Sequence, residues 1–130
     1  MNIAETKTIK FHTKEYEYDS GIDVQIDEEY VFKACVIDKL MDWFVPTTLD
    51  GFFNPLLLIL KKRVKSENCF KLIAMIKNND DKKYIAVGSD SKVKTCPMPG
   101  RLFFFVNDAD SKSAYKNNKG SIEIQITRVE

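Results

Sequence analysis

Alternation of apolar and polar residues recurs along this chain and constrains its fold more than any other feature. The pattern holds over Ile22–Asp27 and again over Ile122–Thr127, and more briefly over Glu15–Tyr18. Successive side chains of a β-strand point to opposite faces, so a period of two predicts strands with one buried and one solvated face. These segments are therefore expected to be half-buried strands.

Short apolar or β-branched runs, bounded by clusters of Gly, Pro, Asn and Asp, predict further strands. They lie at Tyr30–Val36, Leu56–Lys62, Phe70–Lys77, Tyr84–Val87 and Arg101–Val106. Only Asp38–Phe44 is compatible with a helical turn or two. A single sheet of about eight such strands would leave one apolar face in water, so we expect an all-β, antiparallel β-sandwich. The 130 residues fit one domain, 1–130.

Charge and hydropathy exclude several classes of partner. Twenty basic and nineteen acidic residues leave a net charge of +1, which favours neither nucleic acid nor an anionic membrane. The longest apolar run, Leu56–Leu60, is too short to span a bilayer. Met1–Lys14 has no apolar segment typical of a signal peptide. We therefore expect a cytoplasmic protein, or one secreted without a signal peptide.

The residues that catalysis and metal binding most often need are scarce. His12 is the only histidine, and it lies beside Phe11 in an expected strand, so no Ser-His-Asp or Cys-His arrangement is indicated. Cys35, Cys69 and Cys96 are odd in number and widely spaced, which predicts reduced thiols rather than a disulfide framework or a zinc site. We expect a protein that is not an enzyme.

Hard oxygen donors gather in one segment near the C-terminus, Phe105–Ile122, between two strong strands. Carboxylate, amide and carbonyl oxygens held by a loop with fixed ends are what a calcium ion needs. An EF-hand is excluded because Ser113 stands where glycine must turn and Lys119 where the closing glutamate must be. The same residue types are also common in an ordinary hairpin loop, so composition alone leaves both readings open.

The motifs of this segment resemble those of a known family. Asn107-Asp108 at a strand end, then Tyr115-Lys116-Asn117-Asn118-Lys119-Gly120-Ser121 before an alternating last strand, look like the C-terminal signature of the calcium-dependent galactophilic bacterial lectins. Cys69–Ile76 and Pro99–Phe104 resemble two earlier strands of that family, and Ser20–Val24 with Tyr30–Ala34 resembles an early strand pair of its superfamily. The resemblance implies a jelly-roll-like, galactose-binding-domain-like sandwich.

Transferred to this chain, the resemblance implies a calcium site. Asp108, Asn117 and Asn118 would be side-chain ligands of Ca²⁺, and Ala114 would contribute its carbonyl. In the family the ion binds two sugar hydroxyls, so Asp108 and Asn117 would also contact the sugar. The family's histidine-proline loop, which recognises galactose, has no counterpart here. The resemblance therefore implies a carbohydrate ligand without fixing galactose as its identity.

An aromatic-rich segment offers a second contact surface. Trp43, Phe44, Phe52 and Phe53 either pack back onto the sandwich, stack on a sugar, or contact a protein partner. We predict a carbohydrate-binding, lectin-like protein that uses Trp43 in its sugar site and binds a glycan or glycoconjugate. The alternative is a protein-interaction or assembly module on the same fold, such as a bacterial virulence or secreted-effector component that has lost the sugar site. Either one is compatible with a homo-oligomer.

Overall fold

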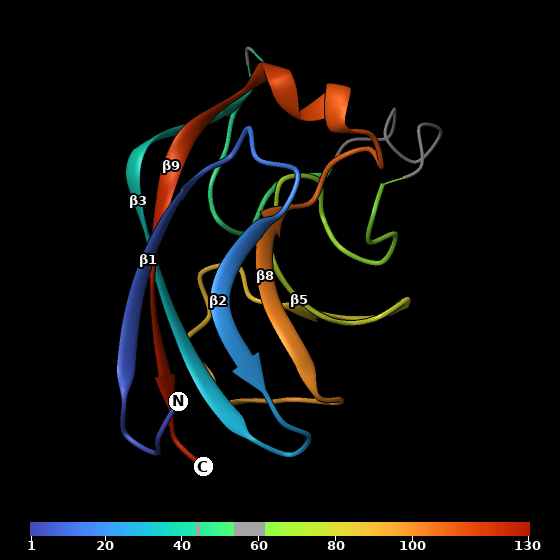
Figure 1. The fold of residues 1–130 in the computed structure, drawn as a ribbon. Helices are drawn as coiled ribbons and strands as arrows, with labels where there is room; N and C mark the ends of the chain where they lie inside the picture. The colour runs from blue at the N-terminus through green and yellow to red at the C-terminus, as the bar shows by residue number, and fades with distance from the viewer. Residues whose placement is uncertain (44, 54–61) are drawn as a thin grey trace.

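The computed structural model describes residues 1–43, 45–53 and 62–130. These ranges form nine β-strands and one short 3₁₀ helix, arranged as two facing antiparallel sheets (Figure 1). The strands are β1 (Thr6–His12), β2 (Tyr18–Val24), β3 (Glu29–Asp42), β4 (Val45–Pro46), β5 (Leu72–Asn78), β6 (Asp81–Ala86), β7 (Lys94–Thr95), β8 (Gly100–Val106) and β9 (Asn118–Arg128), and the helix is η1 (Lys112–Asn117). The expected all-β sandwich is confirmed.

Each sheet brings together strands that are distant in the sequence. The first sheet has the order β1-β9-β3-β4, with β7 also paired to β3, and the second has the order β2-β8-β5-β6. The alternating last strand, β9, lies between β1 and β3, where Ile124 faces Ile9 on one side and Ala34 on the other. Its central position explains why its apolar residues are completely buried.

The core lies between the sheets, and a smaller apolar cluster lies on the outer face of the second sheet. Phe32 of the first sheet meets Phe104 of the second edge-to-face, with ring centroids 5.5 Å apart. On the outer face, Ile73, Met75 and Phe105 are also fully buried, with Val64 packed against them. The segment after residue 62 therefore covers part of a face that would otherwise be wet, which explains why β5 reads as a continuous apolar run.

The expected helical turn at Asp38–Phe44 is wrong. β3 continues to Asp42, with irregular register against β9 between Val36 and Asp38 and again between Asp38 and Met41. Bulges of this kind interrupt the two-residue period, so the local pattern no longer reads as a strand although the ladder continues. Phe44 and most of the strand expected at Leu56–Lys62 lie outside the described residues.

Two smaller features bear on the expectations from the sequence. All three cysteines are free thiols, with Cys35 exposed and Cys69 and Cys96 buried. Among the described residues, no helix combines the length and apolar character needed to cross a membrane.

Candidate functional site

Three segments that carry the candidate residues meet at one end of the sandwich, uppermost in Figure 1. β3 ends there at Asp42, β8 ends just before Asn107-Asp108, and β9 begins there at Asn118 after η1. Asp42 and Asn118 are direct partners in the ladder between β3 and β9. The register of the sheet therefore places the Asp42 carboxylate and the Asn118 carboxamide next to each other.

Asp108 and Asn118 are buried polar side chains that each leave one oxygen unpaired. Asp108 is 4% exposed and Asn118 is fully buried. The Ala109 amide donates to Asp108 Oδ1 at 2.7 Å, and Asn118 Nδ2 donates to the Thr13 carbonyl at 3.1 Å. Among the residues that the structure describes, Asp108 Oδ2 and Asn118 Oδ1 have no hydrogen-bond partner. A buried acceptor without a partner destabilises the fold by about 1–3 kcal/mol. A ligand that binds these two oxygens would remove that cost.

Two further donors complete the cluster. A carboxylate oxygen of Asp42, the Cys69 sulfur and a carboxylate oxygen of Asp108 all lie within 4.8 Å of one another. The Cys69 thiol, which is fully buried, donates to Asp42 Oδ2 with a sulfur–oxygen distance of 3.7 Å. The cluster thus combines two carboxylates, one carboxamide oxygen and one thiol.

The pKa values in the cluster show that negative charge is poorly accommodated. Burial raises the pKa of Asp108 to about 6. The Ala109 hydrogen bond and the neighbouring Asn118 side chain oppose this shift, and the nearby Asp42 carboxylate adds to it. Burial likewise raises the pKa of Asp42. Burial, and then the neighbouring carboxylates of Asp42 and Asp108, raise the pKa of the Cys69 thiol. Two carboxylates that share a buried space repel each other, and a bound cation would remove that repulsion.

The chemistry of the donors suits a divalent cation. Carboxylate and carboxamide oxygens are ligands for calcium, whereas a thiolate suits softer ions such as zinc. The two unpaired oxygens of Asp108 and Asn118 are hard donors, so the donor set fits a hard cation with Cys69 at its edge. In this arrangement the chain would hold an ion through side chains from β3, the β8 end and the β9 start.

Asn107 holds the backbone on which Asp108 and Cys69 sit. Its buried Nδ2 donates to the carbonyls of Val64, Glu67 and Asn68 at 2.9–3.1 Å, and its Oδ1 accepts from the Val64 amide at 3.0 Å. One side chain therefore fixes the segment that leads into Cys69 against the end of β8. The Arg63 amide also donates to the Asp108 carbonyl at 2.9 Å.

The loop that reaches Cys69 from the other side depends on Gly51. Its φ is +72°, and an added Cβ would lie 2.2 Å from the Cys69 carbonyl oxygen. Glycine alone permits so close an approach at this backbone angle. The next residue, Phe52, donates its amide to the same carbonyl at 2.8 Å.

Of the four residues expected to hold the ion, two lie in the cluster and two belong to η1. Asp108 and Asn118 are the buried pair described above. The Asn117 side chain is exposed, and its carbonyl accepts from the Trp43 amide at 3.1 Å. Ala114 lies within η1 and is partly buried against the core. The roles of these four residues as ligands stay predictions.

The aromatic segment divides between core and surface. Trp43 is 60% exposed and Phe53 is 70% exposed, whereas Phe52 packs against the core. Trp43 follows Asp42 directly and is tied by its amide to Asn117, so it borders the cluster. Phe44 lies outside the described residues.

Asp42 and Cys69 were not predicted as site residues. Asp42 stands in a segment whose strand pattern is broken by bulges, and Cys69 stands in a run that resembled a family strand without a metal spacing. The pairing of Asp42 with Asn118 would have been the only signal, and it requires the register of the sheet.

Comparison with known proteins supports the fold. The chain is similar to a solved structure described as the N-terminal domain of EclA, a PllA-like lectin, with a TM-score of 0.63 and 19% sequence identity. The similarity covers 93% of this chain and 94% of that chain, so the two share one sandwich over nearly their whole length. No protein-family model matches the sequence. A search of curated protein sequences also gives no match.

Proposed function

We propose that this protein is a non-catalytic, lectin-like module that binds a carbohydrate through a divalent cation at the Asp42–Cys69–Asp108–Asn118 cluster. The observation that carries the proposal is the pair of buried, unpaired oxygens on Asp108 and Asn118 beside a second carboxylate. The similarity of the fold to that of a PllA-like lectin supports the same assignment.

Calcium is the cation that we propose. Calcium binds carboxylate, carboxamide and backbone oxygens in a flexible geometry, and it retains positions for water. Two neighbouring sugar hydroxyls can replace two of those waters. Asp108 and Asn118 would hold the ion, while Asn117 and the exposed Trp43 border the position where the sugar would lie. An indole ring packs well against the C–H face of a sugar.

Calorimetric titration with calcium chloride, followed by a glycan array with and without a chelator, tests the proposal. We expect calcium binding by the wild-type chain and glycan binding that the chelator abolishes. Asp108→Ala should lose both, and Asn118→Ala should weaken both. Asp80→Asn is the matched control, because it removes an acid from an exposed turn and should leave both unchanged. The array also reports which sugar is bound.

Absence of both calcium binding and glycan binding would favour the alternative function. Wild-type protein that binds neither calcium nor any glycan, and that forms oligomers as its concentration rises, would refute the lectin proposal. It would support the assembly module instead, with the exposed Trp43 and Phe53 as part of the contact surface.

A further inference from the structure

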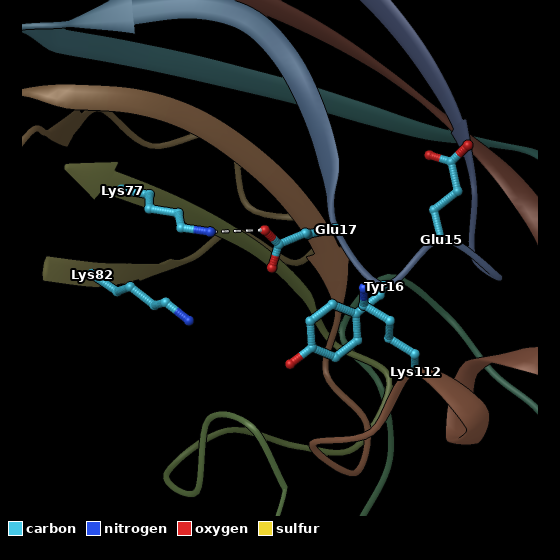
Figure 2. Close-up of a pocket in the computed structure, with 6 residues that line it drawn as sticks. All are labelled: Glu15, Tyr16, Glu17, Lys77, Lys82 and Lys112. Atoms are coloured by element: carbon cyan, nitrogen blue, oxygen red, sulfur yellow. Dashed lines mark ion pairs between the residues drawn. The ribbon is translucent and has the colours of Figure 1, made fainter. Parts of the chain in front are cut away.

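A pocket lies on the outer face of the second sheet, and none of its lining residues belongs to the Asp42–Cys69–Asp108–Asn118 cluster. It has a volume of about 540 Å³. It is lined by Glu15, Tyr16, Glu17, Lys77, Lys82 and Lys112 (Figure 2). Lys77 and Lys82 are partners in the β5–β6 hairpin, while Lys112 begins η1 and the other three residues directly precede β2. Three separate parts of the chain thus contribute lysines or acids to one pocket.

The aromatic wall of this pocket, Tyr16, is held rigidly. The Arg63 guanidinium lies between two rings, with its central carbon 3.8 Å from the Tyr16 centroid and 3.6 Å from that of Phe105. Tyr115 meets Tyr16 edge-on with centroids 5.3 Å apart, and the Tyr16 hydroxyl donates to Asp110. A side chain fixed from three sides loses little further freedom when a ligand packs against it, which favours binding.

The charges around Tyr16 leave two ammonium groups without acidic partners. Glu17 is neutralised by Arg63 at 2.9 Å and by Lys77 at 3.5 Å. Within the part of the chain that the structure describes, neither Lys82 nor Lys112 makes an ion pair. Figure 2 shows the Glu15 carboxylate directed away from Lys77 and Lys82. The three lysines of the lining outnumber its two glutamates, so the pocket carries a net positive charge beside an aromatic ring.

We propose that this pocket binds the acidic sugar of a glycan, with Lys82 and Lys112 contacting its carboxylate or sulfate group and Tyr16 packing against its ring. Ammonium groups bind anions through charge-assisted hydrogen bonds, and aromatic rings bind the apolar face of a sugar. The choice of a sugar rather than another anion rests on the function proposed above.

The helix η1 leads from this pocket to Asn117, which directly precedes the cluster residue Asn118. Lys112 stands at its first residue and Asn117 at its last. A 3₁₀ helix rises about 2.0 Å per residue, so the two ends are about 10 Å apart. One oligosaccharide can span that separation, with a neutral sugar at the cation and an acidic sugar at the lysines.

A pair of ligands that differ only in charge provides the test. The isotope-labelled full chain is titrated with the methyl glycoside of glucuronic acid and, separately, with the methyl ester of that glycoside, while amide chemical shifts are recorded by NMR. We expect the acid to shift the amides of Tyr16, Lys82 and Lys112 and to bind about three- to tenfold more tightly than the ester. A sulfated monosaccharide in a parallel titration shows whether sulfate is accepted as well as carboxylate.

Single substitutions locate the contact. Lys82→Gln and Lys112→Gln should each weaken binding of the acid about threefold or more and leave binding of the ester unchanged. Lys83→Gln is the matched control, because neighbouring residues of a strand point to opposite faces and Lys83 therefore lies away from the pocket. Binding of the acid monosaccharide should persist in the presence of a chelator.

The possible outcomes separate this proposal from the one above. Equal binding of acid and ester, or wild-type binding by both lysine variants, would overturn the acidic-sugar pocket even if cation-dependent glycan binding is observed. Inorganic sulfate that binds as tightly as the acid would show a general anion site and would also overturn it. Conversely, loss of cation binding in Asp108→Ala with unchanged binding of the acid would leave this proposal intact.

Discussion

Asp108→Asn tests the central physical claim, which is that this carboxylate is buried without adequate compensation. The substitution preserves the shape of the side chain and an oxygen for the Ala109 amide, but it removes the charge. The pKa of Asp108 is raised from 3.8 to about 6, chiefly by burial. At about 1.36 kcal/mol per unit, this shift makes the ionised group destabilising by about 3 kcal/mol.

The sign of the effect follows from the direction of the pKa shift. The folded protein retains the Asp108 proton at pH values where the unfolded chain has released it. Its contribution to stability is therefore complete below pH 3.8 and is lost as the pH rises through about 6. In the presence of a chelator, Asp108→Asn should match the wild type near pH 4 and exceed its free energy of unfolding by up to about 3 kcal/mol above pH 6.

Urea unfolding followed by far-ultraviolet circular dichroism, over a pH series in chelator, measures this difference. Asp42 titrates in both proteins, so the comparison isolates Asp108 to a first approximation. Asp80→Asn should show no comparable dependence on pH. Calcium at a hundred times its dissociation constant should then stabilise the wild type by about 2.7 kcal/mol and leave Asp108→Asn unaffected. A difference between variant and wild type that stays constant from pH 4 to pH 7 would refute the reasoning.

Three further substitutions test other parts of the structure. Arg63→Ala should lower the free energy of unfolding by about 3 kcal/mol, because it removes a guanidinium that is 2% exposed and leaves Glu17 without its nearest partner; a loss under about 1 kcal/mol in urea unfolding would contradict this. Asn107→Ala should cost about 2–4 kcal/mol by the same assay and should also weaken calcium binding, since its four hydrogen bonds fix the segment before Cys69. Cys69→Ser should weaken binding of cadmium, measured by calorimetry, far more than binding of calcium, and equal losses for both ions would show that the sulfur lies outside the ligand set.

Most strands could be predicted because their signal is local. The two strands expected over Glu15–Tyr18 and Ile22–Asp27 instead overlap a single strand, β2, which runs only from Tyr18 to Val24. Alternation at Ile122–Thr127 indicates a strand with one buried and one solvent-exposed face, and it does so without knowledge of the neighbouring strands. The prediction failed at Asp38–Phe44 because the bulges that keep β3 paired with β9 also break the period on which the prediction depends. The 3₁₀ helix at Lys112–Asn117 was likewise not predicted, since its polar residues are equally typical of a loop.

Only part of the candidate site could be predicted from the sequence. Asp108 and Asn118 belong to a motif that resembles a known family, so they could be named in advance, but their burial and their unpaired oxygens could not. Asp42 joins them only through the register of β3 with β9, and Cys69 only because Asn107 fixes the preceding segment at the end of β8. The lysine pocket similarly depends on Arg63 fixing Tyr16.

The sequence by itself determined most of the strands and the need to pack them as two layers, because side-chain alternation and the need to bury apolar faces act on each segment separately. The tertiary structure alone decided which acids share a buried space, which oxygens lack partners and which lysines remain unpaired. Those properties depend on distances between residues that are remote in the chain, and only packing sets such distances.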